Sequence, residues 1–232
     1  MKRQGLCSFK VKHLETDLFV QAAEDISSLV SAWVIEARTS IESYARSHAG
    51  FLESYFPLPE DLFAPPPVNW MLHAGQVAGT GPMAAVAGAI ARFVCEKAAL
   101  ILDGEIIVEN GGDTCFRATE PVTAAIWAGK SLFTGKIGVR CAPSDSGFMS
   151  ICTSSGTVGH STSFGSADAV TVLCEDGALA DAVATAVGNM VNSRKDVSRA
   201  VARLSEFPGI IGGVVIKGEQ IGAWGNIELV PL

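Results

Sequence analysis

Residues 169–189, AVTVLCEDGALADAVATAVGN, decide the fold class. The first six residues are apolar and rich in β-branched side chains, which is typical of a buried strand. After the Glu-Asp-Gly turn, alanine and valine recur at helical spacing and predict a helix over 176–191. A buried strand followed at once by an apolar helix predicts a sheet that is covered by helices.

The segments around this strand and helix are mostly short apolar runs separated by glycine, proline and polar turns. Consecutive strands flanked by helices predict an α+β fold with a mainly antiparallel sheet packed against helices. Near the N-terminus we expect a hairpin over 6–22, a long helix with apolar positions from Ile26 to Ile41 that Gly50 ends, and an alanine-rich helix that begins at Pro82. Further along we expect strands at 105–110, 124–128, 136–141 and 147–153, a helix at 193–204 and a strand meander at 210–230.

The length of 232 residues suits one domain over 1–232. Residues 55–70, YFPLPEDLFAPPPVNW, are dense in proline, which excludes regular structure and predicts an extended segment. If the domain consists of two intimately packed halves, we expect them to divide near residues 51–68.

Composition and charge exclude several classes of protein. Hydrophobic residues make up 48% of the chain, but no run of about 18 apolar residues predicts a membrane span. The net charge of −7 and the absence of basic clusters argue against nucleic acid or an anionic membrane as partner. The six cysteines form no C-x-x-C pair, so buried reduced thiols and a cytoplasmic location are expected.

A first candidate site motif is the sequence Asn110-Gly111-Gly112-Asp113 at the end of a predicted strand. Two consecutive glycines can adopt positive φ and allow the backbone to approach a ligand closely. The same residues are also a strong signal for a β-hairpin turn. Both interpretations remain open from the sequence.

A second candidate is formed by Asp181 and Thr185, which are four residues apart on the predicted helix and share one face. A carboxylate and a hydroxyl are oxygen ligands that suit a hard cation such as Mg²⁺. Alternatively, Asp181 could stabilise the first turn of its own helix while Thr185 bonds back to a carbonyl.

The third candidate is the hydroxyl-rich and glycine-rich stretch at 152–168, CTSSGTVGHSTSFGSAD. Its hydroxyls and amides could contact phosphate groups, and an ordinary loop seldom needs so many of them. The chain contains neither G-x-S-x-G nor H-E-x-x-H, which argues against a serine hydrolase of that type and a zinc protease. The candidate residues here are Ser154, Ser155, Gly156, Thr157 and His160.

These motifs, in the order VENGGD, TSSGTVGH, AVTVL and LADAVATAVGN, resemble the ApbE family of flavin transferases. The similarity is greater to its short bacterial and archaeal relatives, and it also includes AGTGPMAAVAGAIA and WAGKSLFTGKIGVR. The resemblance implies a T-fold-like α+β architecture with a site for the flavin dinucleotide FAD. It also implies Mg²⁺-dependent chemistry at the FAD pyrophosphate, either FMN transfer to an acceptor protein or hydrolysis of FAD to FMN and AMP.

The resemblance also implies roles for individual residues. Gly111, Gly112 and Asp113 match the family's GGD loop, and Ser154, Ser155 and Gly156, with Thr157 beside them, match a second FAD-binding loop. Asp181 and Thr185 match the family's metal-binding element, and His160 occupies the place of a proposed catalytic histidine.

The chain departs from the transferase pattern at two places. His160 is not followed by the family's Asp-Pro, and the glycine-rich segment that contains Pro82 lacks the family's lysine. A flavin-binding or flavin-delivery protein without turnover is therefore an alternative. An unrelated enzyme acting on another nucleotide or a pterin is a further one. Small-residue helix faces and an exposed sheet edge are compatible with a homodimer.

Overall fold

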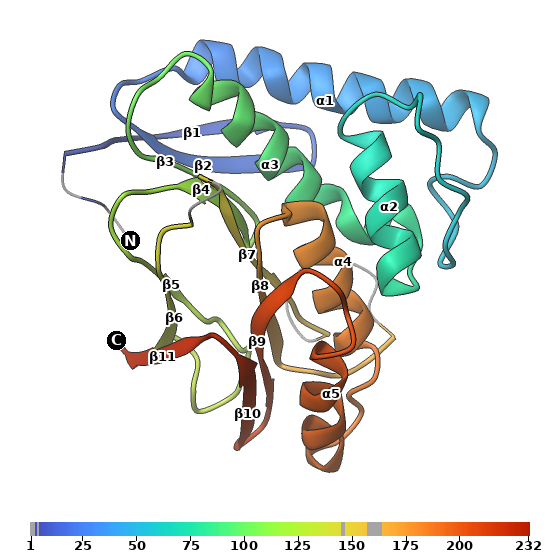
Figure 1. Ribbon diagram of the computed structural model, residues 1–232, viewed down its shortest axis with the longest axis vertical. Helices are drawn as coiled ribbons and strands as arrows, with labels where there is room; N and C mark the ends of the chain where they lie inside the picture. Colours follow the sequence, from blue (N-terminus) through green and yellow to red (C-terminus); the bar gives the residue numbers. More distant parts are fainter. Residues whose placement is uncertain (1–2, 4, 145–146, 157–163) are drawn as a thin grey trace.

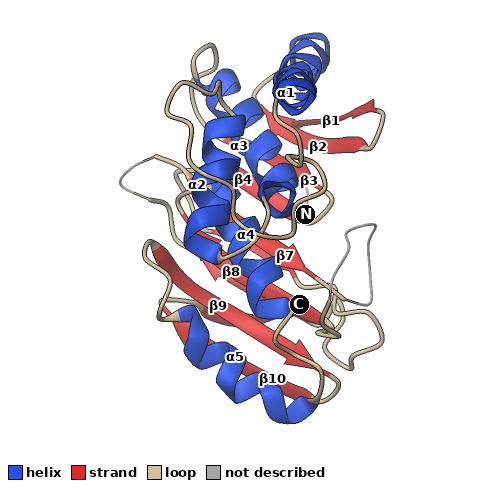
Figure 2. Ribbon diagram, turned by 90° about the vertical axis from the view of Figure 1, so that its right-hand side faces the viewer, coloured by secondary structure: helices blue, strands red, loops and turns tan. Residues whose placement is uncertain are grey.

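The computed structural model describes residues 3, 5–144, 147–156 and 164–232, and these form two antiparallel sheets with helices on one side (Figures 1 and 2). The main sheet has eight strands in the order β1-β2-β3-β4-β7-β8-β9-β10 within the described residues. Its strands are β1 (Cys7–His13), β2 (Thr16–Ala22), β3 (Ile106–Asn110), β4 (Asp113–Arg117), β7 (Met149–Ser154), β8 (Ala169–Cys174), β9 (Ile210–Lys217) and β10 (Gln220–Gly225).

The helices cover one face of this sheet, as Figure 2 shows. Apolar residues that recur every three or four positions on α1 point inward, and the small side chains of α3 and α4 allow these two helices to lie close to the strands and to each other. The helices are α1 (Ser27–Ser47), α2 (Val68–Ala78), α3 (Val86–Ala99), α4 (Gly177–Gly188) and α5 (Val197–Leu204), with short 3₁₀ turns at Pro82–Ala85 and Arg194–Asp196.

The opposite face of the main sheet packs against a three-stranded sheet in the order β11-β6-β5. Its strands are β5 (Val122–Ala125), β6 (Ile137–Cys141) and β11 (Glu228–Pro231). Strand alternation sends side chains to both cores: Ile151 packs toward the small sheet, whereas its neighbour Cys152 packs toward the helices. The two faces of β4 and β7 therefore present different side chains to different environments.

The α+β prediction with a mainly antiparallel sheet is confirmed, because every strand pair described is antiparallel. Two local predictions were wrong. The proline-rich segment gives way at Val68 to helix α2, which the sequence analysis did not predict. The last strand also does not continue the meander, since β11 leaves β10 and pairs with β6 in the other sheet.

Five of the six cysteines are buried free thiols as expected, but Cys7 is exposed. In the described part of the chain, no single helix combines the length and apolar composition of a membrane span. The helices Val68–Ala78 and Pro82–Ala99 meet those criteria only as a pair, and they are bent by 106°.

Candidate functional site

The Gly111-Gly112 turn joins β3 to β4 as a two-residue hairpin loop. Gly111 has φ +64° and Gly112 has φ +110°, and the flanking Asn110 and Asp113 pair across the ladder. Positive φ at both central residues matches the right-handed twist of the two strands, so the turn interpretation is confirmed. An ideal Cβ on Gly111 would meet nothing within 4 Å, so the outer side of the turn is open.

The hairpin end is fixed to the start of α3. The Asn110 side-chain amide donates to the carbonyl oxygen of Ala87 at 3.1 Å. Asp181 reaches the same place from α4, because its Oδ2 accepts a hydrogen bond from the Gly88 amide at 3.0 Å. The Asn110-Gly111-Gly112 turn and the Asp181 carboxylate therefore meet at two consecutive residues of one helix end.

Asp181 is not the cap of its own helix, so the first-turn alternative was wrong. The Asp176 carboxylate caps α4 by accepting from Ala178 N at 2.9 Å and Leu179 N at 3.2 Å. Asp181 lies one turn further along and instead accepts from the first turn of α3, whose own N-cap position provides no side-chain hydrogen bond. An anionic carboxylate is favourable at this helix N-terminus.

A close approach of two glycines brings α3 and α4 together at this point. A Cβ on Gly88 would lie 2.2 Å from the Gly177 carbonyl oxygen and 2.9 Å from the Asp181 Cβ. Only glycine fits here, which is why the Asp181 carboxylate can reach the Gly88 amide. The sequence analysis missed this role of Gly88.

Asp113 lies on the helix-facing side of the sheet, next to Cys152. Thr114 pairs with Ile151, so the adjacent position of the ladder sets Asp113 beside Cys152 of β7. The Asp113 side chain is only 7% exposed, and its Oδ1 is buried without a hydrogen-bond partner. This carboxylate therefore does not face the cavity side of the hairpin, where its neighbour Thr114 points.

Burial raises the pKa of both carboxyl groups. Desolvation raises the pKa of Asp181 to about 7, although the amides of Gly88 and Ala87 oppose this effect. Desolvation, followed by repulsion from the Asp181 charge, holds the pKa of Asp113 well above its ordinary value. Within the described residues, no basic side chain forms an ion pair with either group.

The structure brings together several other predicted residues. The Thr185 hydroxyl donates to the Ser154 hydroxyl at 3.5 Å, on the same side of the sheet as Asp181. The Gly156 amide donates to the Ala167 carbonyl at 2.9 Å, so this amide is already engaged, contrary to the expectation that it is exposed for a ligand. Thr157 and His160 lie outside the described residues.

A cavity of about 820 Å³ lies on the other face of the sheet, between it and β5. This volume is in the range of small-molecule and cofactor sites. Gly111, Gly112 and Ser155 line it, and the exposed Trp127 offers an aromatic face. Thr114, Thr153 and Thr171 also line it, as do Arg3 and Glu109.

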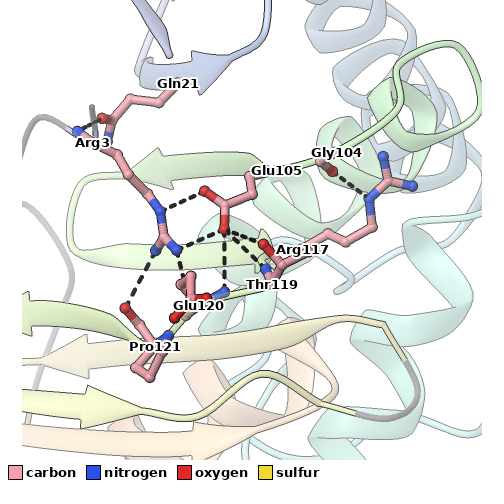
Figure 3. Close-up of polar contacts among 8 residues, drawn as sticks. All are labelled: Arg3, Gln21, Gly104, Glu105, Arg117, Thr119, Glu120 and Pro121. Carbon is pink, nitrogen blue, oxygen red and sulfur yellow. Dashed lines mark hydrogen bonds and ion pairs between the residues drawn. The ribbon is translucent and has the colours of Figure 1, made fainter. Parts of the chain in front are cut away.

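One wall of the cavity is residues 121–127, which line it consecutively. Side chains of a strand alternate, so consecutive lining residues mean that the backbone edge of β5 faces the cavity. Arg3 holds the start of this wall (Figure 3): its Nε lies 2.5 Å from Glu105 Oε2, and it also donates to the carbonyls of Glu120 and of Pro121, the first residue of the wall. The sequence analysis did not identify Arg3 or Glu105, which are brought together from distant parts of the chain.

The donor set at the helix-facing side suits a hard divalent cation. Asp113 and Asp181 supply buried carboxylate oxygens without a basic counter-charge, and Thr185 supplies a hydroxyl. Mg²⁺ is usually bound by one or two carboxylates and keeps water or phosphate as its other ligands. Among the described residues, no group of three or more His, Cys, Asp or Glu side chains is arranged to hold a metal.

Sequence comparison shows the family to which the chain belongs. The family model described as AbpE bacteria matches residues 1–207. The chain belongs to this family. Archaeal proteins are similar to it: a UPF0280 protein of Methanocaldococcus jannaschii is 41% identical over 202 residues, which cover 85% of this chain and 82% of that protein. A UPF0280 protein of Archaeoglobus fulgidus is 36% identical and covers 94% of this chain and 92% of its own.

Solved structures confirm the ApbE fold for this member of the AbpE bacteria family. The apo flavinyl transferase ApbE of Pseudomonas stutzeri has a TM-score of 0.58 at 13% identity, covering 94% of this chain and 93% of that one. The flavin transferase ApbE of Vibrio cholerae has a TM-score of 0.57 at 12% identity, covering 94% and 96%. The predicted resemblance to ApbE proteins is thereby confirmed at the level of family and fold.

Proposed function

We propose that this protein binds FAD in the cavity and acts, with Mg²⁺, on the pyrophosphate that joins the two halves of the dinucleotide. The observation that carries the proposal is the meeting of an 820 Å³ cavity, an open glycine turn and two buried carboxylates around the end of one hairpin. The ApbE proteins of similar fold, a flavinyl transferase and a flavin transferase, support the choice of a flavin.

In this proposal, different parts of the site bind different parts of FAD. The flavin ring lies in the cavity against Trp127, whose exposed ring can stack on it. The Gly111-Gly112 turn and the Ser154-Ser155 segment donate hydrogen bonds to the phosphate end. Asp181 and Thr185 hold the cation, which when bound would neutralise charge on the pyrophosphate.

The reaction breaks the bond between the FMN phosphorus and the bridging oxygen, and AMP leaves with that oxygen. In transfer, a serine or threonine hydroxyl of an acceptor protein forms the new bond to the phosphorus. In hydrolysis, water does so. Either nucleophile loses a proton, and His160 is the proposed group that accepts it. A homodimer is also part of this proposal, and light scattering of the purified protein tests it.

Binding without turnover is the second candidate, because the Asp-Pro after His160 and the family's lysine are missing. Incubation of the protein with FAD, in Mg²⁺ or in EDTA, followed by chromatography of FAD, FMN and AMP, separates the two. Turnover that requires Mg²⁺ and is lost in Asp181→Asn, but kept in the exposed control Asp103→Ala, supports the enzyme. Tight binding of FAD that is recovered intact supports delivery. Absence of FAD binding, with a thermal shift in ATP or a pterin, would refute both.

A further inference from the structure

The placement of Asp113 assigns it a role that its position in the glycine turn does not suggest. As part of the Gly111-Gly112-Asp113 sequence, it would be expected to contact the dinucleotide from the cavity. The strand alternation turns it the other way, toward Cys152 and helix α4, while Thr114 lines the cavity. Its carboxylate is thus on the same side of the sheet as Asp181.

The environment of Asp113 is incomplete without another group. Its Oδ1 has no hydrogen-bond partner, although the side chain is only 7% exposed. An unpaired buried carboxylate oxygen is costly unless a proton or a cation compensates it. No Arg or Lys side chain of the described residues forms an ion pair with Asp113.

The hydrogen bonds of Asp181 place its carboxylate beside the end of the hairpin that carries Asp113. Asp181 accepts from Gly88, and Asn110, which pairs with Asp113 across the hairpin, donates to Ala87. The first turn of α3 therefore ties both ends of the site together. A cation between the carboxylates would satisfy the free Oδ1 and balance two negative charges.

We propose that Asp113 is a second carboxylate ligand of the divalent cation held by Asp181 and Thr185. This inference rests on the proposed function, since it concerns the same metal. It makes the metal site a two-carboxylate site that binds Mg²⁺ or Mn²⁺ before the nucleotide arrives. In it, Asp113 belongs to the metal site and not to the flavin-contacting surface of the turn.

The test is the Mn²⁺ affinity of the free protein, measured by electron paramagnetic resonance in the absence of nucleotide. Asp113→Asn and Asp181→Asn are each expected to weaken Mn²⁺ binding by about 10-fold or more. Glu109→Gln is the matched control, because Glu109 lies on the same hairpin but faces the cavity. A general loss of negative charge at that exposed position is expected to change the affinity by about threefold at most.

FAD binding in EDTA, followed by quenching of flavin fluorescence, separates this inference from the proposed function. If FAD binds to Asp113→Asn as to the wild type while Mn²⁺ binding is weakened, the inference holds. The inference is wrong if Asp113→Asn binds Mn²⁺ like the wild type while Asp181→Asn does not. It is also wrong if the wild type binds no Mn²⁺ without nucleotide. The proposed function survives either result. If FAD fails to bind to the wild type, the proposed function fails, and the Mn²⁺ comparison still decides the role of Asp113. Thermal unfolding of each variant shows that it is folded.

Discussion

Replacement of Asp181 by asparagine is expected to remove a pH dependence from the stability of the metal-free protein. Asparagine keeps an oxygen that accepts from Gly88 but cannot ionise. In the wild type, burial raises the pKa of Asp181 from 3.8 to about 7, so between these values the folded chain holds a proton that the unfolded chain has lost. The free energy of unfolding therefore falls as pH rises through this window and levels off above it.

The difference between a pKa of 3.8 in the unfolded chain and about 7 in the folded chain corresponds to a change of about 4 kcal/mol in the free energy of unfolding. From pH 5 to pH 8, the wild type is expected to lose about 3 kcal/mol relative to Asp181→Asn. The pKa of Glu105 is shifted in the other direction. Burial raises it, but hydrogen bonds from Thr119 and Glu120 and the charge of Arg3 lower it by more. Glu105 therefore stabilises the folded protein at pH values above its ordinary pKa. That contribution is common to both proteins and cancels in the difference.

Urea unfolding at pH 5, 6, 7 and 8 in EDTA measures this difference. If the free energies of unfolding of the wild type and Asp181→Asn change in parallel from pH 5 to pH 8, Asp181 is not buried without a compensating charge. Added Mg²⁺ is expected to stabilise the wild type most at pH 8, where the carboxylate is ionised, and to leave Asp181→Asn nearly unchanged.

Three further predictions concern the surroundings of the site. Gly88→Ala places a methyl group against the Gly177 carbonyl and is expected to destabilise the protein by about 3 kcal/mol or more in urea unfolding. Gly111→Ala meets no atoms and is expected to cost only about 1–2 kcal/mol for its left-handed backbone, so equal losses for the two variants would contradict this packing. Arg3→Ala removes the ion pair to Glu105 and is expected to weaken FAD binding, measured by fluorescence titration, with only a small decrease in melting temperature. An unchanged FAD affinity would show that the wall at 121–127 does not depend on Arg3.

Much of the fold was predictable because its signals are local. The strand and helix at 169–189 and the Gly111-Gly112 turn each depend on residues adjacent in the sequence, and the structure contains all three. Helix α2 was missed because its start follows a run of prolines, and Pro67 in fact occupies its N-cap position. The change of β11 to the second sheet depends on pairing with β6, about ninety residues earlier, and no local signal specifies such a partner.

The candidate site was likewise predictable only where its signals are local in the sequence. The spacing of Asp181 and Thr185 predicts a shared helix face, and in the structure Asp181 accepts from the Gly88 amide while Thr185 donates to Ser154 of the sheet. The sequence could not show that Asp181 contacts α3, because that contact depends on the close approach of Gly88 and Gly177 from separate segments. It also could not show which way Asp113 points, since this depends on the register of β4 against β7.

The position of the hairpin end constrains how a dinucleotide can use both faces of the sheet. The cavity and the two carboxylates lie on opposite faces, and the continuous ladder from β3 through β4 to β7 separates them. A ligand in the cavity can therefore approach the carboxylates only around the Gly111-Gly112 turn, where β3 and β4 end. Side chains at these two positions would obstruct that path, whereas an open turn leaves it free. For FAD bound as proposed, the pyrophosphate must lie at this turn, with the flavin on the cavity side.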